Sequence, residues 1–445
     1  MNLETFTPMK NQPKITVGIM DRQAEVNGSL DGNFRVDGFG PVSGQFSGKA
    51  EKGMIVLFDE AHCEITRSSL IKLIASKDSK FTLFNVTIGK RFHWERKEDQ
   101  TFQGDLILQT PKDRMVSAIN EIPLEDYLES VISSEMSVEA PIEFLKAHAI
   151  LSRSWLLVAL DRKKKAEEPS IPAPVGKIIE GEVIRWYDRE DHDFFDVCAD
   201  DHCQRYQGIT KIISNQAQEA AQETRGMVIT HQDQICDARY SKACGGLTEE
   251  FATAWDDKRV PYLTSISDAS IPHPPIKTEK EAFSWILSEP EAYCNTKDKH
   301  LLEKILPDFD RETKEFFRWR VEYSRKELEE ILREKSGFDF GTLQEIRPLR
   351  RGPSGRIYQL KIVGSKRSMV VGKELEIRRW LSPTHLYSSA FVVVVEGDRI
   401  IFHGAGWGHG VGLCQIGAAV MANQGFSAEQ ILKHYFKGIE IKKIY

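Results

Sequence analysis

Alternating apolar and polar residues dominate the first quarter of the chain. Between Lys14 and about Thr110, short runs such as KITVGIM, MIVLF and KFTLFNVTI are separated by Gly, Asn and Asp at turn-like intervals. Such runs, rich in β-branched and aromatic residues, are typical of strands joined by short turns. The pattern predicts a β-rich N-terminal region over residues 14–115, preceded by a tail of residues 1–13.

The period then becomes helical. Apolar residues recur on one face at Ile122, Leu124, Leu128 and Val131, and Pro123 suits a first helical turn. The same spacing predicts a second helix from about 141 to 160. The charged, proline-containing segment 161–176 is then expected to be a loop.

The rest of the chain mixes both kinds of pattern. Residues 226–254 indicate strands and turns, and the charged segment 271–345 is expected to be helical. Strand patterns resume over 346–445, which ends in a helix with Ser427 and Gln430 in capping-box spacing. These patterns predict a multi-domain α+β fold.

Composition limits the classes of protein to consider. A chain of 445 residues is too long for one hydrophobic core, and 41% hydrophobic with 28% charged residues is typical of folded domains. A net charge of -6 argues against general binding to nucleic acid or to a membrane surface. No run of about 18 apolar residues predicts a transmembrane helix. The first twenty residues contain no recognisable secretory signal, so we expect either a cytoplasmic protein or a chain from which a signal was removed.

Seven cysteines, an odd number spread over a long chain, do not suggest a disulfide framework. Cys198 and Cys203 lie close together, with His192 and His202 beside them. Two thiolates and two imidazoles are a ligand set for tetrahedral zinc. The spacing is not that of a zinc finger, and two buried cysteines beside two surface histidines remain the alternative.

Glu135 stands between the two predicted helices, next to Met136 and ahead of Pro141. Most glutamates at a helix end are solvated surface charges. At a rigid junction, however, the carboxyl would be partly desolvated, as a general acid requires.

Two glycine-containing segments are further candidates. FHGAGWGHGVGLCQIGA, residues 402–418, lacks the GKS or GKT ending of a phosphate-binding loop, and its glycines permit close approach of a ligand or of another segment. The alternative is a tight turn between a strand and a helix. ARYSKACGGLTEE, residues 238–250, suggests a substrate-contacting loop and lacks the G-x-S-x-G motif of a serine hydrolase.

Taken in order, EIPLEDYLESVISSEM, YSKACGGLTEE, SGRIYQLKIVG and FHGAGWGHGVGLCQIGA resemble the SpoIID/LytB family, and the similarity covers nearly the whole chain. The resemblance implies a lytic transglycosylase of peptidoglycan glycan strands, located in the cell envelope. Glu135, in the EM pair, takes the catalytic position. His192, Cys198, His202 and Cys203, ahead of QRYQG, take the positions of a structural zinc site. Other members are amidase enhancers that need not cleave glycan, so an alternative is a non-catalytic peptidoglycan-binding protein or activator of a cell-wall amidase.

The family pattern also implies a mixed α/β catalytic core over 116–270 with a central cleft, which 346–445 completes. The residues expected to contact substrate are Ser134, Lys146, Arg153, Tyr240, Ser241, Gly245, Gly246, His403, Trp407, His409 and Gln415. The chain departs from the family where it has SEMS in place of SEMP, His148 in place of a glutamine, and no signal peptide. A third possibility is a cytoplasmic protein that keeps only the fold.

Overall fold

The structure, a computed structural model, describes residues 12–36, 39–90, 95–110, 115–166, 176–187, 192–212, 215–311 and 315–445. Residues 1–11 of the predicted tail lie outside this range. The chain forms two units, one of Met1–Glu167, Asp191–Val228 and Lys443–Tyr445, the other of Glu168–Glu190 and Ile229–Lys442. Each unit is therefore discontinuous in sequence.

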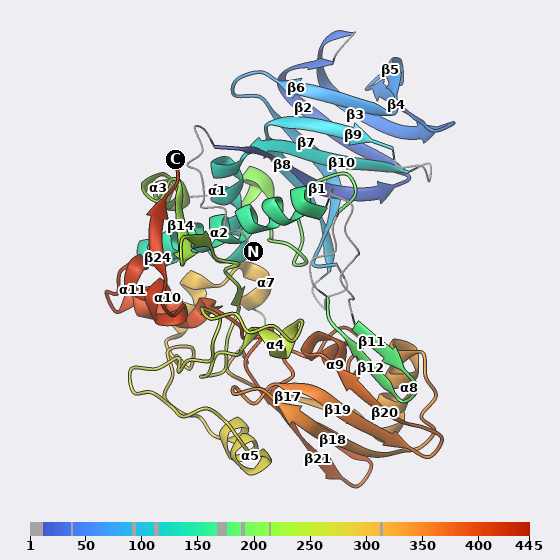
Figure 1. Ribbon diagram of the computed structural model, residues 1–445. Coiled ribbons are helices and arrows are strands. Elements are labelled where there is room, and N and C mark those ends of the chain that lie inside the picture. Colours follow the sequence, from blue (N-terminus) through green and yellow to red (C-terminus); the bar gives the residue numbers. More distant parts are fainter. Residues whose placement is uncertain are drawn as a thin grey trace. The chain divides into compact units, whose positions relative to one another are not determined.

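The apolar runs of the N-terminal region form the strands of an 11-stranded sheet in the first unit (Figure 1). The strands are β1 (Lys14–Gln23), β2 (Glu25–Val36), β3 (Gly40–Glu51), β4 (Met54–Asp59), β5 (Glu64–Ser68), β6 (Leu70–Ala75), β7 (Lys80–Ile88), β8 (Arg96–Gln103), β9 (Asp105–Gln109), β10 (Val116–Pro123) and β13 (Val197–Cys198). Their order is β13-β1-β10-β9-β6-β2-β3-β4-β5, and β7 pairs with both β2 and β8. The predicted β-rich region is confirmed.

Helix α1 (Leu124–Glu135) follows directly on β10, with Pro123 at its N-cap position. The helix was predicted too early, because Ile122 belongs to β10 and pairs there with Ile15 of β1. Helix α2 (Ile142–Ala166) begins where expected but continues into the segment predicted to be a loop. Because DRKKKA contains neither glycine nor proline, nothing in it ends the helix. The rest of that predicted loop, residues 167–175, lies outside the described residues.

Helices α1, α2 and α3 (Asn215–Glu223) contact one another, and the 3-10 helix η1 (Gly208–Lys211) contacts α1 and β8. These elements place the end of α1 beside the segment that follows β13.

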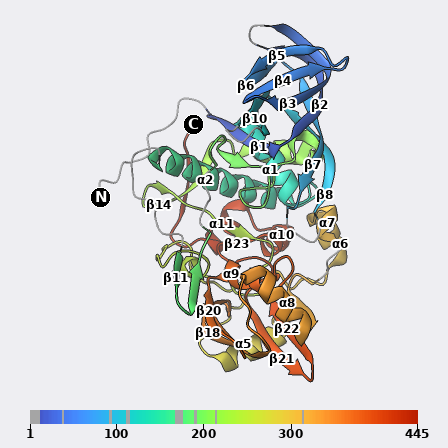
Figure 2. The same cartoon turned by 90° about the vertical axis from the view of Figure 1, so that its right-hand side faces the viewer.

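The second unit contains a five-stranded sheet, ordered β11 (Gly176–Ile179), β12 (Glu182–Arg185), β20 (Ser368–Gly372), β19 (Ile357–Gly364) and β18 (Leu343–Arg351). A three-stranded sheet is formed by β17 (Arg318–Ser324), β22 (Arg399–Ala405) and β21 (Phe391–Glu396). Helices α8 (Arg325–Ser336) and α9 (Glu374–Trp380) belong to the same unit (Figure 2). One apolar core joins both sheets to these helices, through residues such as Leu328, Leu360, Trp380 and Phe402.

The segment expected to be wholly helical does contain α5 (Glu279–Leu287), α6 (Lys299–Ile305), α7 (Asp308–Arg311) and α8, but β17 interrupts it. That prediction was wrong for RWRVEYS, in which Trp319, Val321 and Tyr323 alternate with polar residues. Conversely, ELEIRRW, expected as strand, forms α9, in which the buried apolar residues Ile377 and Trp380 are spaced to lie on one face of a helix.

Short elements connect the loops of the second unit. Strands β14 (Met227–His231), β15 (Gln234–Ile235) and β24 (Glu440–Lys443) form one small sheet, and β16 (Tyr240–Ser241) pairs in parallel with β23 (Leu413–Cys414). Around them lie α4 (Phe251–Ala254), α10 (Gln415–Asn423) and α11 (Ala428–Tyr435). Ser427 and Gln430 form the predicted capping box of α11. No helix in the described part of the chain is long and apolar enough to cross a membrane.

Candidate active site and metal centre

Glu135 is the last residue of α1, and only 7% of its surface is exposed. The backbone N–H of Arg205 donates a hydrogen bond of 3.0 Å to its Oε1. One residue earlier, Ser134 Oγ accepts a 3.3 Å hydrogen bond from the N–H of Gln207. The carboxyl is therefore buried and held in place, which excludes the solvated surface charge considered from the sequence.

The segment Gln204–Gln207 that holds Glu135 is itself well anchored. Tyr127 Oη donates to Gln204 Oε1 at 3.3 Å, and Tyr206 Oη donates to Asn120 Oδ1 at 2.5 Å. The rings of Tyr127 and Tyr206 stack with centroids 5.0 Å apart. Aromatic stacking and buried hydrogen bonds thus fix this segment against α1 and β10.

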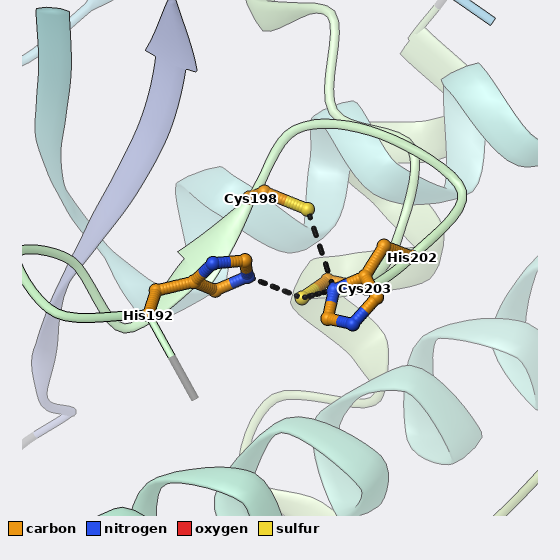
Figure 3. Close-up of side chains that lie close together, drawn as sticks. All are labelled: His192, Cys198, His202 and Cys203. Carbon is orange, nitrogen blue, oxygen red and sulfur yellow. Dashed lines mark hydrogen bonds between the residues drawn. The ribbon is translucent and has the colours of Figure 1, made fainter. Parts of the chain in front are cut away.

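The predicted metal-ligand residues come together immediately before this segment. Figure 3 shows the rings of His192 and His202 directed toward the sulfur of Cys203, with Cys198 beside them. His192 Nε2 lies 3.4 Å from Cys203 Sγ, and His202 Nδ1 lies 3.4 Å from Cys203 Sγ and 3.8 Å from Cys198 Sγ.

These distances fit one tetrahedral ion. Zinc bonds of about 2.3 Å to sulfur and about 2.0 Å to nitrogen place neighbouring ligand atoms about 3.6 Å apart. All four ligand atoms lie within 4.8 Å of one another. Hydrogen bonds, first with Cys203 and then with His192 and His202, outweigh burial and lower the pKa of Cys198 to about 2, which favours a thiolate. The alternative of two buried cysteines beside unrelated surface histidines does not fit this geometry.

Two residues expected to contact substrate carry charges that are already paired inside the first unit. Lys146 Nζ lies 2.8 Å from Glu143 and 2.7 Å from Glu223. Arg153 has no exposed surface and forms a two-bond ion pair with Glu125, at 2.9 and 2.6 Å. The burial of Arg153 argues against a contact with a substrate carboxylate.

The two glycine-containing segments of the second unit contact each other. Ala243 and Trp407 exchange two backbone hydrogen bonds, of 3.2 and 2.7 Å. A Cβ on Gly406 would lie 2.7 Å from the carbonyl oxygen of Ala243, and one on Gly410 would lie 2.3 Å from Cζ of Arg356. Both glycines also have φ values near +75°. Gly406 and Gly410 therefore allow close contact with another segment of the chain. Such a contact was considered from the sequence, alongside the close approach of a ligand.

Arg356 and Glu249 organise these segments but were missed from the sequence. Arg356 is fully buried and donates to the carbonyl oxygens of Cys244 and Gly408, each at 3.1 Å. Glu249 is also fully buried and accepts a 2.6 Å hydrogen bond from Ser354 Oγ. SGRIYQ contains Arg356 and belongs to the motifs of the resemblance, but a single arginine gives no sign of its distant partners.

The aromatic and histidine candidates of the second unit have defined surroundings. Trp407 stacks on Tyr387 with ring centroids 4.1 Å apart. His409 Nδ1 accepts a 3.0 Å hydrogen bond from the N–H of Val411, and burial, reinforced by Arg239, Arg356 and Arg378, lowers its pKa well below the usual value. The lowered pKa favours the neutral imidazole at His409.

The remaining candidates differ in exposure. Ser241, Gly245, Gly246 and Gln415 are buried, whereas Tyr240 on β16 and His403 on β22 are partly exposed. Among the six, the two partly exposed residues have side-chain surface with which to contact a ligand in this structure.

Comparison with known proteins assigns the part of the chain that contains Glu135 and the Cys/His cluster. Residues 112–231 match the family described as Stage II sporulation protein, SpoIID. The chain contains a domain of the SpoIID family. Residues 249–412 match a separate family described as a domain of unknown function, DUF8618. The SpoIID match thus ends before the glycine-containing segments begin.

Similar proteins extend the SpoIID likeness beyond that domain. Stage II sporulation protein D of Bacillus amyloliquefaciens is 23% identical over 73% of this chain and 76% of its own length. The protein of that name from Bacillus subtilis is 22% identical over the same shares. An amidase enhancer of Bacillus subtilis is 25% identical over 49% of this chain but only 31% of its own length. The SpoIID domain and these similarities support a role connected with the cell wall.

Proposed function

We propose that this protein is a peptidoglycan lytic transglycosylase in which Glu135 is both acid and base. The supporting observation is the buried Glu135 carboxyl, fixed at the end of α1 by the backbone of Arg205 within the SpoIID-matched residues. A carboxyl held on rigid elements is the arrangement that proton transfer requires.

The reaction requires a single carboxyl. Protonated Glu135 donates its proton to the oxygen of the MurNAc–GlcNAc bond as the bond from that oxygen to C1 breaks. The resulting carboxylate takes the proton from the C6 hydroxyl of MurNAc, whose oxygen bonds to C1. Water is not consumed, and the product carries a 1,6-anhydro end. Ordinary glycosidases use two carboxyls because they must also activate water or form a glycosyl intermediate.

The Cys/His cluster is proposed to hold a structural zinc ion. Four protein ligands would leave no position for a reacting water, so the ion would supply rigidity and not Lewis-acid chemistry. Cys203 directly precedes Gln204–Gln207, whose N–H groups orient Glu135 and Ser134. The cluster would therefore fix the Glu135 carboxyl indirectly, by holding its hydrogen-bond donor.

Glycan strands outside the cytoplasm are the proposed substrate, which places the working protein in the cell envelope. Tyr240, His403 and Trp407 remain our predicted sugar contacts, because aromatic and polar side chains suit sugar faces and hydroxyls. Tyr240 and His403 are partly exposed, and the stacking of Tyr387 on Trp407 fixes the ring of Trp407.

The decisive experiment incubates the protein with glycan strands, with and without peptide stems, and counts 1,6-anhydro ends by mass spectrometry. Wild type is expected to form them, and Glu135→Gln, which keeps an oxygen acceptor for Arg205, is expected to lower the rate at least about 10³-fold. Glu139→Gln is the matched control, because Glu139 lies four residues further on and is exposed. Unchanged turnover in Glu135→Gln would remove Glu135 from the mechanism.

The likeness to an amidase enhancer favours a second candidate, activation of a cell-wall amidase without cleavage of glycan. That function predicts no anhydro ends from wild type, together with a faster amidase reaction when the protein is added. Glu135→Gln would leave such stimulation unchanged, so the same pair of variants separates the two functions.

A further inference from the structure

Four buried side chains, none of them a predicted site residue, lie together in the second unit: Cys244, Asp268, Cys294 and Cys414. Their ligand atoms, three sulfurs and a carboxylate oxygen, all lie within 4.8 Å of one another. Their exposed fractions are 2%, 0%, 3% and 0%, so the cluster is sealed from solvent. Cys244 lies just after β16 and Cys414 ends β23, whereas Asp268 and Cys294 come from two other loops.

The sulfur positions suit a shared metal ion better than a disulfide. Cys244 Sγ and Cys294 Sγ are 3.7 Å apart. Zinc–sulfur bonds of about 2.3 Å place two tetrahedral ligands about 3.8 Å apart. A disulfide would require about 2.05 Å, and all the cysteines are free.

Asp268 gives an independent reason to expect a cation. Its Oδ1 accepts a 2.6 Å hydrogen bond from Tyr435 Oη, and its Oδ2 accepts a 3.0 Å hydrogen bond from the N–H of Cys294. No lysine or arginine in the described ranges forms an ion pair with it. Burying a carboxylate without a cation is costly, and a metal ion removes that cost.

The surroundings also suit thiolate ligands. The N–H of Cys244 donates a 3.2 Å hydrogen bond to Cys414 Sγ. Two arginines donate to neighbouring carbonyl oxygens, the buried Arg356 to Cys244 at 3.1 Å and the half-buried Arg318 to Gly245 at 3.0 Å. N–H···S bonds and nearby cations stabilise the excess negative charge of a thiolate-rich site.

We propose that Cys244, Asp268, Cys294 and Cys414 form a second, structural metal site that takes one Zn²⁺ ion with three sulfur ligands and one oxygen ligand. Thiolates select zinc over magnesium or calcium, and a sealed tetrahedral set has no place for substrate. The competing explanation is that three cysteines act as small apolar residues in the core. That explanation accounts for the thiols, but it requires the buried Asp268 carboxyl among them to be neutral, whereas a metal ion would bind it as a carboxylate.

The site would hold together segments that have little regular structure of their own. Cys244 follows the two residues of β16 and Cys414 ends the two residues of β23, and these strands carry the contact between residues 238–250 and 402–418. Through Asp268 and Cys294, two more loops would be bound to the same metal ion. Because the site is sealed, the ion would enter as the unit folds.

Zinc content per chain tests the proposal. The Cys198→Ser/Cys203→Ser variant removes the site of the first unit, so any ion that remains belongs to the second. Purified under reducing conditions with zinc, this variant is expected to retain one equivalent of zinc by plasma mass spectrometry. Additional replacement of Cys244 and Cys294 by serine should lose it. Cys236→Ser, which removes a buried cysteine outside the cluster, is the matched control and should retain it.

X-ray absorption on wild type needs no variant to fold. Two loaded sites give an average of about 2.5 sulfur ligands per zinc ion, against about 2 if only the first site is filled. Less than about one tenth of an equivalent in the Cys198→Ser/Cys203→Ser variant, with about 2 sulfurs per zinc ion in wild type, would overturn the proposal. A Cys244–Cys294 disulfide in peptides from unreduced protein would do the same.

Discussion

Arg153 and Glu125 form a fully buried ion pair in the first unit, and their remaining hydrogen-bonding capacity is also used. Arg153 Nη1 donates to the carbonyl oxygen of Met227 at 2.9 Å, while Glu125 Oε1 accepts from the N–H of Gly226 at 3.3 Å and from Tyr445 Oη. A pair of this kind is expensive to break, because the partner left behind keeps an unpaired buried charge.

Arg153→Met is therefore expected to lower the free energy of unfolding by about 3–5 kcal/mol, measured by urea denaturation followed by circular dichroism. Lys164→Met removes an exposed cation from the same helix and should change stability by no more than about 0.5 kcal/mol. A small effect of Arg153→Met, with loss of binding to glycan strands, would restore the predicted substrate contact.

At this scale the sequence predicts a residue's chemistry better than its partners. The position of Glu135 was predictable because the helical spacing on both sides is local. The distant partners of Lys146, Arg153 and Arg356 were not, because only the folded chain brings them together. Cys244 and Cys414 lie in the two predicted loops. The spacing of the residues in the sequence does not indicate that these cysteines lie close to Asp268 and Cys294.

Among the elements, helix α1 presents a line of acidic residues as well as the apolar face that places Glu135. Burial raises the pKa of Glu129 to about 7 from 4.5, and the charge of Asp126 adds to the effect. In the unfolded chain the carboxyl has its ordinary pKa. Between pH 4.5 and 7 unfolding therefore releases a proton, and Glu129 makes the first unit less stable as the pH rises through this window.

Glu129→Gln replaces the carboxyl by a neutral group of the same shape. The melting temperature of the variant should match wild type near pH 4, exceed it increasingly up to about pH 7, and then keep a constant advantage. Melting curves at pH 4, 5.5, 7 and 8 measure this difference. A difference that does not change with pH would contradict the raised pKa.

Elements were predictable where one local pattern dominated. The strands of residues 14–110 and the capped helix α11 follow directly from alternation and from the capping box. Strand β17 was missed because charged residues surround the alternation of Trp319, Val321 and Tyr323. Helix α9 was missed because ELEIRRW follows a strand without a clear turn. In both cases burial in the shared core of the second unit determines the structure.

For the whole molecule, the division into two compact units predicts two unfolding transitions. Cys203→Ser and Arg153→Met lie in the first unit and should lower one transition in scanning calorimetry. Trp380→Ala removes a large side chain from the core of the second unit and should lower the other. A single transition shifted equally by all three variants would show that the units unfold together.

Metal removal is expected to act on the same two transitions. Prolonged chelation of wild type during a slow unfolding scan should lower the first-unit transition, because the proposed zinc ion would anchor Gln204–Gln207 through Cys203. With the Cys198→Ser/Cys203→Ser variant, chelation should affect the second transition alone. Full thermal stability after complete removal of zinc would show that neither ion is structural.

The discontinuity of the first unit has a consequence for synthesis on the ribosome. The N–H of Ile444 donates to the carbonyl oxygen of Gly226, and Tyr445 Oη donates to Glu125, so residues made after the second unit help to complete a unit whose sheet is largely made before it. Domains usually fold in the order in which they emerge. Here the nascent first unit must wait, with the Arg153–Glu125 pair only partly enclosed, until the whole second unit has been translated.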